Sequence, residues 1–324
     1  MSHLFNRIFL YLHIVNIETD FNFQTLQLAY DYEGSVTATL IAAKANSARK
    51  KAVLYVHGFI DYFFQAHVAE KFLTQGFDFY ALDLRKYGRS ILPHQHPNFC
   101  QDISEYFEEI SIALSQIYGE QKTEITLLGH STGGLIAAAY MNNGTEKEKV
   151  KNVVLNSPFL DFYLSEPLKF IGLNVARLGA KILPYGKLNN GLPPSYPESI
   201  HQDYQGDWDF NLNWKPIQGF PTLFKWVLAI YKAQQNLNHS KITVPVLLLH
   251  SHRSLKMKKF KEAAHSADIV LNVEHMKKIG PKLGKNVTLI EIQNGMHDLF
   301  LSKKAARETA FEEMFRWLSF QMES

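Results

Sequence analysis

A serine placed between glycines is the strongest chemical signal in the sequence. Residues 129–133 read Gly-His-Ser-Thr-Gly, which matches the pattern G-x-S-x-G. The apolar run 125–128 before the motif is typical of a buried strand, and the small-residue stretch 135–141 after it is typical of a helix. A strand, a tight turn and a helix in this order expose a serine hydroxyl, and flanking glycines let neighbouring backbone approach it. The pattern predicts Ser131 as a nucleophile; the alternative is a glycine-rich helix start without chemistry.

A serine hydroxyl is a weak nucleophile and needs an adjacent base that accepts its proton. His297 is the best candidate, because it follows the predicted strand 287–292 and precedes the last predicted helix, 303–320. Sites in mostly parallel sheets form at the carboxyl ends of strands, and the other histidines lack this placement. We therefore expect His297 to be the base; a loop histidine without a catalytic role is the alternative.

The base in turn needs a carboxylate that fixes its tautomer and stabilises its protonated form. Asp268 lies between Ser131 and His297 in the chain, and so fits the order serine, acid, histidine. Asp161 is the second candidate, and Asp298 is too close to His297 in sequence for the usual geometry. The chain order therefore predicts Asp268 as the acid.

Acyl transfer also needs hydrogen-bond donors for the negative charge that develops on the carbonyl oxygen. The backbone N–H of Thr132, the residue after the predicted nucleophile, is one candidate. The second is the backbone N–H of Phe59 in the sequence His-Gly-Phe at 57–59, which follows the apolar run 52–56. A turn after a strand, with no further role, is the alternative for 57–59.

Short apolar runs alternate with helical patterns along most of the chain. The predicted strands are 35–43, 52–56, 77–82, 125–128, 150–155, 244–249 and 287–292. The predicted helices are 65–74, 102–118, 135–141 and 303–320. Strands separated by helices predict an α/β fold with a mostly parallel sheet and helices on both of its faces.

The alternation stops after residue 156 and resumes at 241. We therefore expect 1–156 and 241–324 to form the α/β core and 157–240 to form a cap inserted over the strand ends. The insertion contains three of the four tryptophans, Trp208, Trp214 and Trp226. Its aromatic side chains either line an apolar substrate pocket or pack only a small core of the insertion itself.

Charge and cysteine content narrow the function classes. The 34 basic and 31 acidic residues leave a formal net charge of +3, which is too balanced to indicate nucleic-acid binding. The single cysteine, Cys100, excludes an intramolecular disulfide and fits a reducing compartment, so we expect the cytoplasm. The sequence has no C-x-x-C or Cys/His metal spacing, and no metal is expected. The lysines within 256–261 are expected on a solvated helix face.

Residues 1–15 are apolar but are interrupted by Arg7 and His13. The segment falls short of the roughly 20 apolar residues of a membrane span, so no stable membrane insertion is expected. Its apolar residues recur at helical spacing between 5 and 12. The segment is expected to pack on the body of the protein; resting on a lipid surface is the alternative.

With these motifs in place, the chain resembles the α/β-hydrolases of the monoacylglycerol lipase and lysophospholipase group. The resemblance covers nearly the whole chain, and its motifs are 57–59, 83–90, 129–134 and 295–298. Segment 83–90 is similar to the group's D-x-R-G-x-G-x-S, with Lys86 where glycine is usual. A second departure is the stretch 251–267, because in the group the acid usually follows its strand closely, whereas here this stretch separates Asp268 from the strand.

The resemblance implies hydrolysis of carboxylic esters with an acyl chain, such as monoacylglycerols or lysophospholipids, by a Ser-His-Asp triad and an acyl-enzyme. No metal or organic cofactor is implied. Proline-type aminopeptidases are similar in fold and motifs, but need acidic cap residues to hold a substrate amine; candidates are Glu166, Glu198, Asp203, Asp207 and Asp209. Haloalkane dehalogenases and epoxide hydrolases carry aspartate at the nucleophile position, and Ser131 argues against them. A non-catalytic binding protein on the same fold is the other alternative, but such relatives typically lose the serine or the histidine.

Overall fold

The computed structural model describes residues 17–323 apart from 46, 48–49, 120, 184 and 190–191. The helical segment expected between residues 5 and 12 lies outside these described residues. The strands of the main sheet are β1 (Asn22–Asp31), β2 (Gly34–Ala43), β3 (Lys51–Val56), β4 (Asp78–Asp83), β5 (Glu124–His130), β6 (Val150–Asn156), β9 (Val246–Ser251) and β10 (Val287–Ile292). In the described part of the chain they form one eight-stranded sheet in the order β1-β2-β4-β3-β5-β6-β9-β10.

The sheet is mostly parallel, as expected. Strand β2 pairs antiparallel with β1 and with β4, whereas every pair from β4 across to β10 is parallel. Parallel strands end at the same edge, so the loops after β3, β5, β6, β9 and β10 all emerge on one side of the sheet. This edge is where residues distant in sequence can meet.

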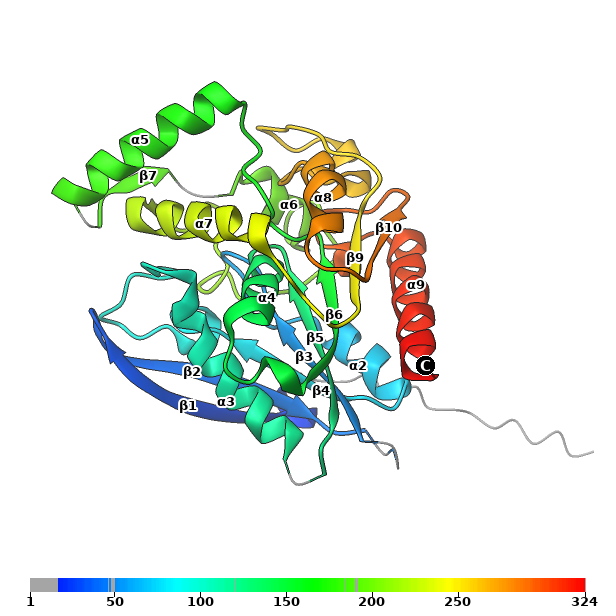
Figure 1. The fold of residues 1–324 in the computed structure, drawn as a ribbon. Helices are drawn as coiled ribbons and strands as arrows, with labels where there is room; N and C mark the ends of the chain where they lie inside the picture. The colour runs from blue at the N-terminus through cyan, green and yellow to red at the C-terminus, as the bar shows by residue number, and fades with distance from the viewer. Residues whose placement is uncertain are drawn as a thin grey trace, which may run out of the picture.

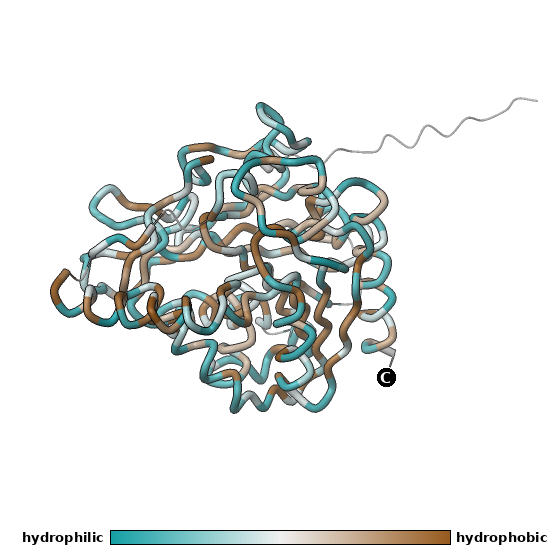
Figure 2. The backbone as a smooth tube through the Cα atoms, turned by 90° about the horizontal axis from the view of Figure 1, so that it is seen from above, coloured by the Kyte–Doolittle hydropathy of each residue, from teal (hydrophilic) through white to brown (hydrophobic). Residues whose placement is uncertain are grey.

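Helices cover both faces of the sheet (Figure 1). Helices α3 (Phe107–Tyr118), α4 (Thr132–Asn143) and α8 (Val273–Ile279) contribute to the core on one face. Helices α2 (Ala66–Thr74) and α9 (Lys304–Glu323) contribute to the core on the other face. A short helix, α1 (Ile17–Asp20), precedes β1. Hydrophobic stretches run through the interior of the molecule between these layers (Figure 2).

Strand β3 explains why the central strands read as continuous apolar runs. Its alternate residues Ala52, Leu54 and Val56 point into the core beneath α3 and α4. The intervening residues Val53 and Tyr55 point into the core beneath α2 and α9. Because successive side chains of a strand face opposite sides of the sheet, a strand covered on both faces needs apolar residues at every position.

Each predicted strand is present, with ends that differ by one or two residues. The prediction missed β1, an edge strand whose side chains are mostly exposed and therefore carry little apolar pattern. The helix predicted over 102–118 is divided into a short 3₁₀ turn, Ile103–Tyr106, and α3. The helix expected at the lysine cluster is wrong: 255–261 is an irregular loop, although its lysines are exposed as expected.

The segment between β6 and β9 has its own small elements. They are α5 (Glu166–Ile182), β7 (Lys187–Asn189), α6 (Ser195–Ile200), β8 (Thr222–Leu223) and α7 (Phe224–Asn236). Helix α5 packs against α7, and β7 pairs antiparallel with β8. Figure 1 shows α5, β7 and α7 beyond the end of the sheet, with α5 outermost. None of the helices in the described ranges has the length and apolar character that crossing a bilayer requires.

Lys86 occupies a position at which the backbone has a φ of 64°. That left-handed conformation favours glycine, which explains why glycine is usual at this point of the motif. The Lys86 side chain is fully buried, and its Nζ lies 2.6 Å from both Asp31 Oδ2 and Glu33 Oε2 at the turn of the β1–β2 hairpin. The lysine thus anchors the edge hairpin to the core at the expense of local strain.

Lys86→Met should lower the free energy of unfolding by about 3–5 kcal/mol, because it leaves two nearly buried carboxylates without their counter-charge. Lys86→Gly removes the same charge but relieves the left-handed strain, so its loss should be smaller by about 1 kcal/mol. Urea denaturation of the two variants measures both quantities. A Lys86→Gly variant as stable as the original protein would contradict a stabilising role for the ion pairs.

Candidate active site

Ser131 sits on the tight turn that joins β5 to α4. Its φ of 52° and ψ of −117° place it in a conformation that side chains rarely adopt. The turn is held by close backbone approach: a Cβ on Gly133 would lie 2.2 Å from the Val56 carbonyl oxygen, and one on Gly129 would lie 2.5 Å from the Gly133 carbonyl oxygen. Both glycines are therefore required by packing, and the strained turn directs the serine away from the sheet.

His297 lies between Ser131 and Asp268, as the order of the three residues in the chain predicted. Its Nε2 is 3.0 Å from Ser131 Oγ, and its Nδ1 is 2.8 Å from Asp268 Oδ2. All three side chains are buried. The other Asp268 oxygen, Oδ1, accepts hydrogen bonds from the backbone N–H groups of Val270 and Leu271. These two donors fix the carboxylate so that its free oxygen faces the histidine.

The structure explains how Asp268 reaches this position despite the long stretch after β9. The backbone of Asp268 pairs with the segment that leaves the strand: its N–H donates to the Arg253 carbonyl at 3.0 Å, and its carbonyl accepts from the Leu255 N–H at 2.9 Å. Residues 255–267 therefore leave and return at the same point. The segment 255–267 adds a surface loop, and Asp268 stays at the end of β9.

The two other aspartates that the sequence raised have different partners. Asp161 forms an ion pair with Lys169 at 3.1 Å. Asp298 is buried; its Oδ1 accepts hydrogen bonds from Asn156 Nδ2 at 2.8 Å and from the Phe300 N–H at 3.0 Å. Asp298 therefore ties the loop that carries His297 to the end of β6 rather than contacting the imidazole.

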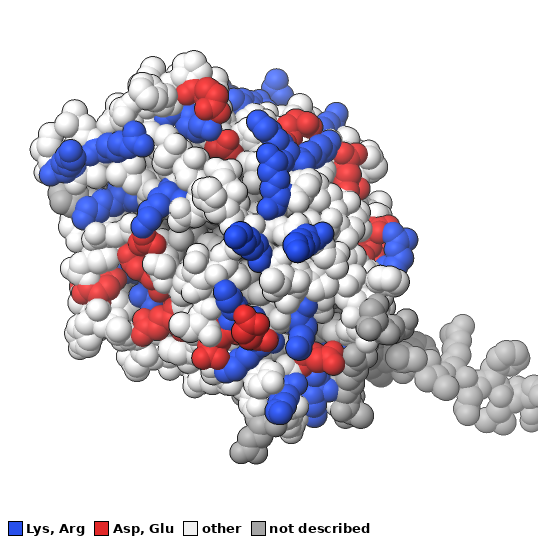
Figure 3. Space-filling view, viewed as in Figure 1, with Lys and Arg blue, Asp and Glu red and all other residues white. Residues whose placement is uncertain are grey.

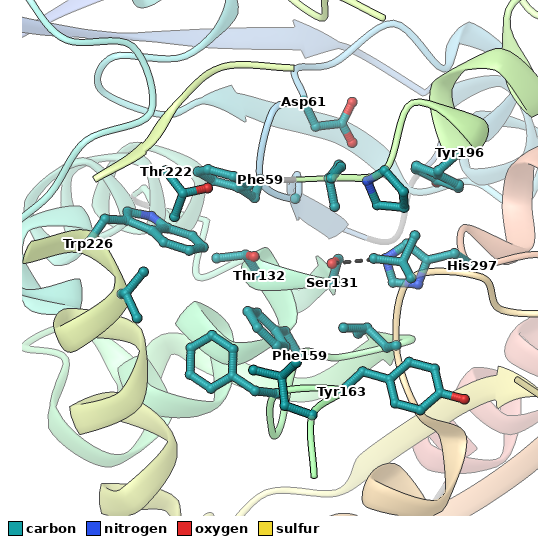
Figure 4. Close-up of a pocket in the computed structure, with 18 of the residues that line it drawn as sticks. Phe59, Asp61, Ser131, Thr132, Phe159, Tyr163, Tyr196, Thr222, Trp226 and His297 are labelled. Atoms are coloured by element: carbon teal, nitrogen blue, oxygen red, sulfur yellow. Dashed lines mark hydrogen bonds between the residues drawn. The ribbon is translucent and has the colours of Figure 1, made fainter. Parts of the chain in front are cut away.

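The two candidate oxyanion donors lie beside the serine. Thr132 is the first residue of α4, and its N–H belongs to a helix N-terminus, where the helix dipole favours negative charge. The loop after β3 comes so close that a Cβ on Gly58 would lie 3.1 Å from Ser131 Cβ, which places the next residue, Phe59, at the same site. In Figure 4, Thr132 and Phe59 lie on the side of Ser131 that faces away from His297.

A cavity of about 260 Å³ opens over Ser131 and His297. Phe159 and Tyr163 lie on one side of the serine, and Trp226 lies beyond Thr132 (Figure 4). Further apolar lining residues from the segment between β6 and β9 are Phe162, Leu164, Leu173, Leu188, Leu192 and Val227. Ser131 and His297 therefore face a mainly apolar cavity.

The aromatic residues of the segment between β6 and β9 divide between the two roles left open by the sequence. The ring of Trp226 packs against Phe59 with centroids 4.0 Å apart and lines the cavity. Trp208 instead stacks on His67 of α2, and its Nε1 donates to the Leu301 carbonyl at 2.8 Å. Some of these aromatics thus line the pocket, and others attach the segment to the core.

A buried ion pair in the cavity was not foreseen from the sequence. Lys215 Nζ lies 2.6 Å from Asp61 Oδ1, and both side chains are nearly inaccessible. Burial alone would raise the pKa of Asp61, but the positive charge of Lys215 outweighs it and holds that pKa below its usual value. The pair joins the loop that carries Phe59 to the segment between β6 and β9. Its partners are far apart in the chain, so no local pattern indicates it.

Two neighbouring rings lie close to the imidazole of His297. The His130 ring lies 5.0 Å from the His297 ring, and burial lowers the pKa of His130, which keeps it neutral near pH 7. The Tyr196 ring covers the other side of His297 at 5.4 Å. Among the residues that the structure describes, no cluster of His, Cys, Asp and Glu could hold a metal ion.

Comparison with solved structures agrees with this architecture. A soluble variant of monoglyceride lipase from Saccharomyces cerevisiae, in complex with a substrate analogue, superposes with a TM-score of 0.70 at 17% identity, covering 92% of this chain and 95% of that chain. The monoacylglycerol lipase of Paleococcus ferrophilus gives 0.65 at 21% identity, covering 87% and 99%. A thermophilic esterase from Thermogutta terrifontis gives 0.59 at 16% identity, covering 92% and 99%.

These likenesses confirm the fold that the resemblance to the monoacylglycerol lipase group implied. No curated protein matches the chain by sequence. The family described as serine aminopeptidase S33, a group of hydrolases, matches residues 47–304. Because that match covers most of the chain, the protein belongs to the serine aminopeptidase S33 family and is an α/β-hydrolase.

Proposed function

We propose that the protein hydrolyses carboxylic esters of acyl-chain substrates, with Ser131 as nucleophile, His297 as general base and Asp268 as the acid that orients the base. The observation that carries this proposal is the pair of hydrogen bonds on either side of the His297 ring, 3.0 Å to Ser131 Oγ and 2.8 Å to Asp268 Oδ2. Nucleophile, base and acid within hydrogen-bond reach form the arrangement that activates a serine.

In the first half-reaction, Ser131 Oγ attacks the ester carbonyl carbon while His297 Nε2 accepts the hydroxyl proton. The carbonyl oxygen becomes an oxyanion, and the N–H groups of Phe59 and Thr132 are the donors proposed to stabilise it. The intermediate collapses when the bond to the alcohol oxygen breaks and His297 returns the proton to that oxygen. The alcohol leaves, and the acyl group remains esterified to Ser131.

In the second half-reaction, water replaces the alcohol. His297 accepts a proton from water as the water oxygen attacks the acyl carbon, and the resulting intermediate releases Ser131 Oγ, which takes the proton back. Asp268 stays ionised throughout and stabilises the imidazolium that forms in each step. The products are a carboxylic acid and the free enzyme.

The cavity supports an acyl chain as the substrate moiety beside the serine. Its lining is mainly aromatic and aliphatic, and such a lining favours apolar ligands. Most of these apolar residues belong to residues 157–240, so we also propose that this segment acts as the cap that shapes the substrate pocket. Monoacylglycerols and lysophospholipids combine an acyl chain with a hydrophilic alcohol, and are the substrates we favour.

The family's description raises aminopeptidase activity as the second candidate, and the charges in the cavity argue against it. Among the described residues that line the cavity, only Asp61 carries a carboxylate, and it is already paired with Lys215. The acidic side chains proposed from the sequence as amine ligands do not line the cavity; they are Glu166, Glu198, Asp203, Asp207 and Asp209. A substrate ammonium would therefore find no free carboxylate there.

Ser131→Ala should abolish labelling by a fluorophosphonate probe, which reacts only with an activated serine. Turnover of p-nitrophenyl butyrate should fall by roughly 10⁴-fold or more, because the members of a triad act as a unit. Ser111→Ala, which alters a serine on α3 away from the cavity, should retain both properties. A non-catalytic binding protein would instead leave the unmodified chain unlabelled.

Asp268→Asn should reduce turnover by about 10⁴-fold, the loss typical of a triad in which asparagine replaces the aspartate and the histidine adopts the wrong tautomer. Asp161→Asn is the matched control and should cost far less, since Asp161 pairs with Lys169. Steady-state kinetics, with thermal melting to check folding, give the ranking. The reverse ranking would transfer the role of the acid to Asp161.

The specificity constant for p-nitrophenyl esters should rise with acyl length, by up to roughly fourfold for each buried methylene, and fall once the cavity is full. Gly172→Phe should shift the optimum to shorter chains, because Gly172 lines the cavity and a Cβ there would meet no atom within 4 Å. A series from two to sixteen carbons measures both effects.

Gly172→Ala is the control for this shift, because it also removes the backbone freedom of glycine but adds little volume. An optimum at acetyl in the unmodified protein would contradict the acyl-chain proposal and leave a short-chain esterase. Proline p-nitroanilide belongs in the same series: turnover that exceeds that of every ester would favour the aminopeptidase.

A further inference from the structure

Helix α5 carries an apolar stripe that faces solvent. The stripe consists of Leu164, Leu168, Ile171, Val175, Leu178 and Ile182, each between 45% and 69% exposed. From Leu168 to Ile182 the spacing alternates between three and four residues, so these five residues follow a single face of α5, and Leu164 lies two residues before the helix begins. Exposed large apolar side chains are ordinary when scattered, but a contiguous stripe marks a surface that binds something apolar.

The stripe is exposed because the opposite face of α5 holds the helix to the protein. Leu173 and Ala176 are buried on that face, where α5 packs against α7. The apolar surface continues beyond the helix through the exposed side chains of Leu183, Tyr185 and Leu188. The exposed area is therefore wider than a single helix seam.

Basic residues border the stripe. Lys181 and Lys187 are exposed on α5 and β7. The loop 255–261 supplies Lys256, Lys258, Lys259 and Lys261, all exposed. Lys256 Nζ lies 4.3 Å from the centre of the Tyr163 ring, which places this loop beside the start of the stripe. Figure 3 shows basic side chains across the upper part of the molecule, where α5 and this loop lie.

The apolar surface also continues into the cavity that holds Ser131. Leu164 and Leu188 are 45% and 40% exposed, and both also line the cavity. Lys169, the basic residue of α5 nearest the cavity, is neutralised by Asp161 and Glu166. An apolar chain could therefore pass from the outer surface of α5 to the serine without crossing an unpaired charge.

We propose that α5 and the loop 255–261 together dock the protein on an anionic lipid surface. The apolar stripe enters the boundary between headgroups and acyl chains, and the bordering lysines contact anionic headgroups. A second copy of the chain is the competing occupant of the stripe. The lipid surface is favoured because basic residues outnumber acidic ones in α5 and the loop 255–261, and because the apolar surface leads into the cavity.

Sedimentation with vesicles tests the proposal, in the Ser131→Ala background so that no lipid is hydrolysed. Vesicles of phosphatidylcholine with 30% phosphatidylglycerol should bind the protein, and more tightly than phosphatidylcholine alone. Leu168→Ser combined with Ile171→Ser and Leu178→Ser should lower the partition coefficient at least tenfold, since three apolar side chains no longer enter the interface. Tyr30→Ser, at an exposed aromatic on β1, is the matched control and should bind normally.

Variants that remove lysines separate the contribution of the basic residues to vesicle binding from that of the apolar stripe. Each basic side chain near an anionic surface contributes about fivefold to partitioning, so Lys256→Gln with Lys258→Gln and Lys259→Gln should weaken binding only to the anionic vesicles. None of the substituted residues lines the cavity. Each variant with Ser131 restored should therefore hydrolyse soluble p-nitrophenyl butyrate as before. If the unmodified protein fails to hydrolyse this ester, the proposed function is overturned but the docking proposal is not.

The competing occupant gives a different outcome. Failure of the unmodified protein to bind either kind of vesicle would overturn the docking proposal. A dimer in analytical ultracentrifugation that the triple serine variant converts to monomer would, together with absent vesicle binding, assign the stripe to a second copy.

Discussion

The strained turn at Ser131 is the constraint on which the rest of the site depends. A non-glycine residue at a φ of 52° costs on the order of 1–3 kcal/mol, and surrounding packing must maintain it. The packing that does so is the contact of Gly133 with the backbone at the end of β3, where no side chain fits. The same contact brings the loop that carries Phe59 against the serine. One close approach of β3, β5 and α4 thus brings Ser131 and both proposed oxyanion donors together.

His297 and Asp268 reach Ser131 because parallel strands end at one edge of the sheet. His297 follows β10, and Asp268 is held at the end of β9 by backbone pairing with Arg253 and Leu255. The loop 255–267 can vary in length, since only its two ends are fixed and closing a longer loop costs little additional entropy. Asp268, the acid predicted from the chain order, therefore lies beside His297 although the stretch 251–267 separates it from its strand in sequence. Asp298 contributes differently, by tying the His297 loop to Asn156 on β6.

Local patterns in the sequence were sufficient for the central strands, because burial on both faces requires continuous apolar runs such as 52–56. They were insufficient for β1, which is an edge strand with a largely polar, exposed composition. They were also insufficient for the pairs Lys86–Asp31 and Asp61–Lys215. The residues next to a lysine in the sequence do not show whether it is buried or exposed. Only the tertiary fold brings the carboxylate that pairs with it within reach. For the loop 255–261 the sequence pattern is misleading in another way. The spacing of its lysines predicts a helix, but the segment is an irregular loop.

The stripe on α5 marks the limit of what periodicity can decide. Apolar residues at spacings of four and three normally indicate the buried face of a helix, and here that face is exposed because Leu173 and Ala176 on the opposite side pack against α7. Helix α5 is therefore apolar on two sides. One side packs against α7, and the other is the side proposed to dock on lipid. The cavity adjoining the stripe is apolar as well, with its charged groups paired. Removal of apolar surface from water attaches the segment between β6 and β9 to the core. The same effect underlies the acyl-chain preference proposed for the cavity and the lipid docking proposed for α5.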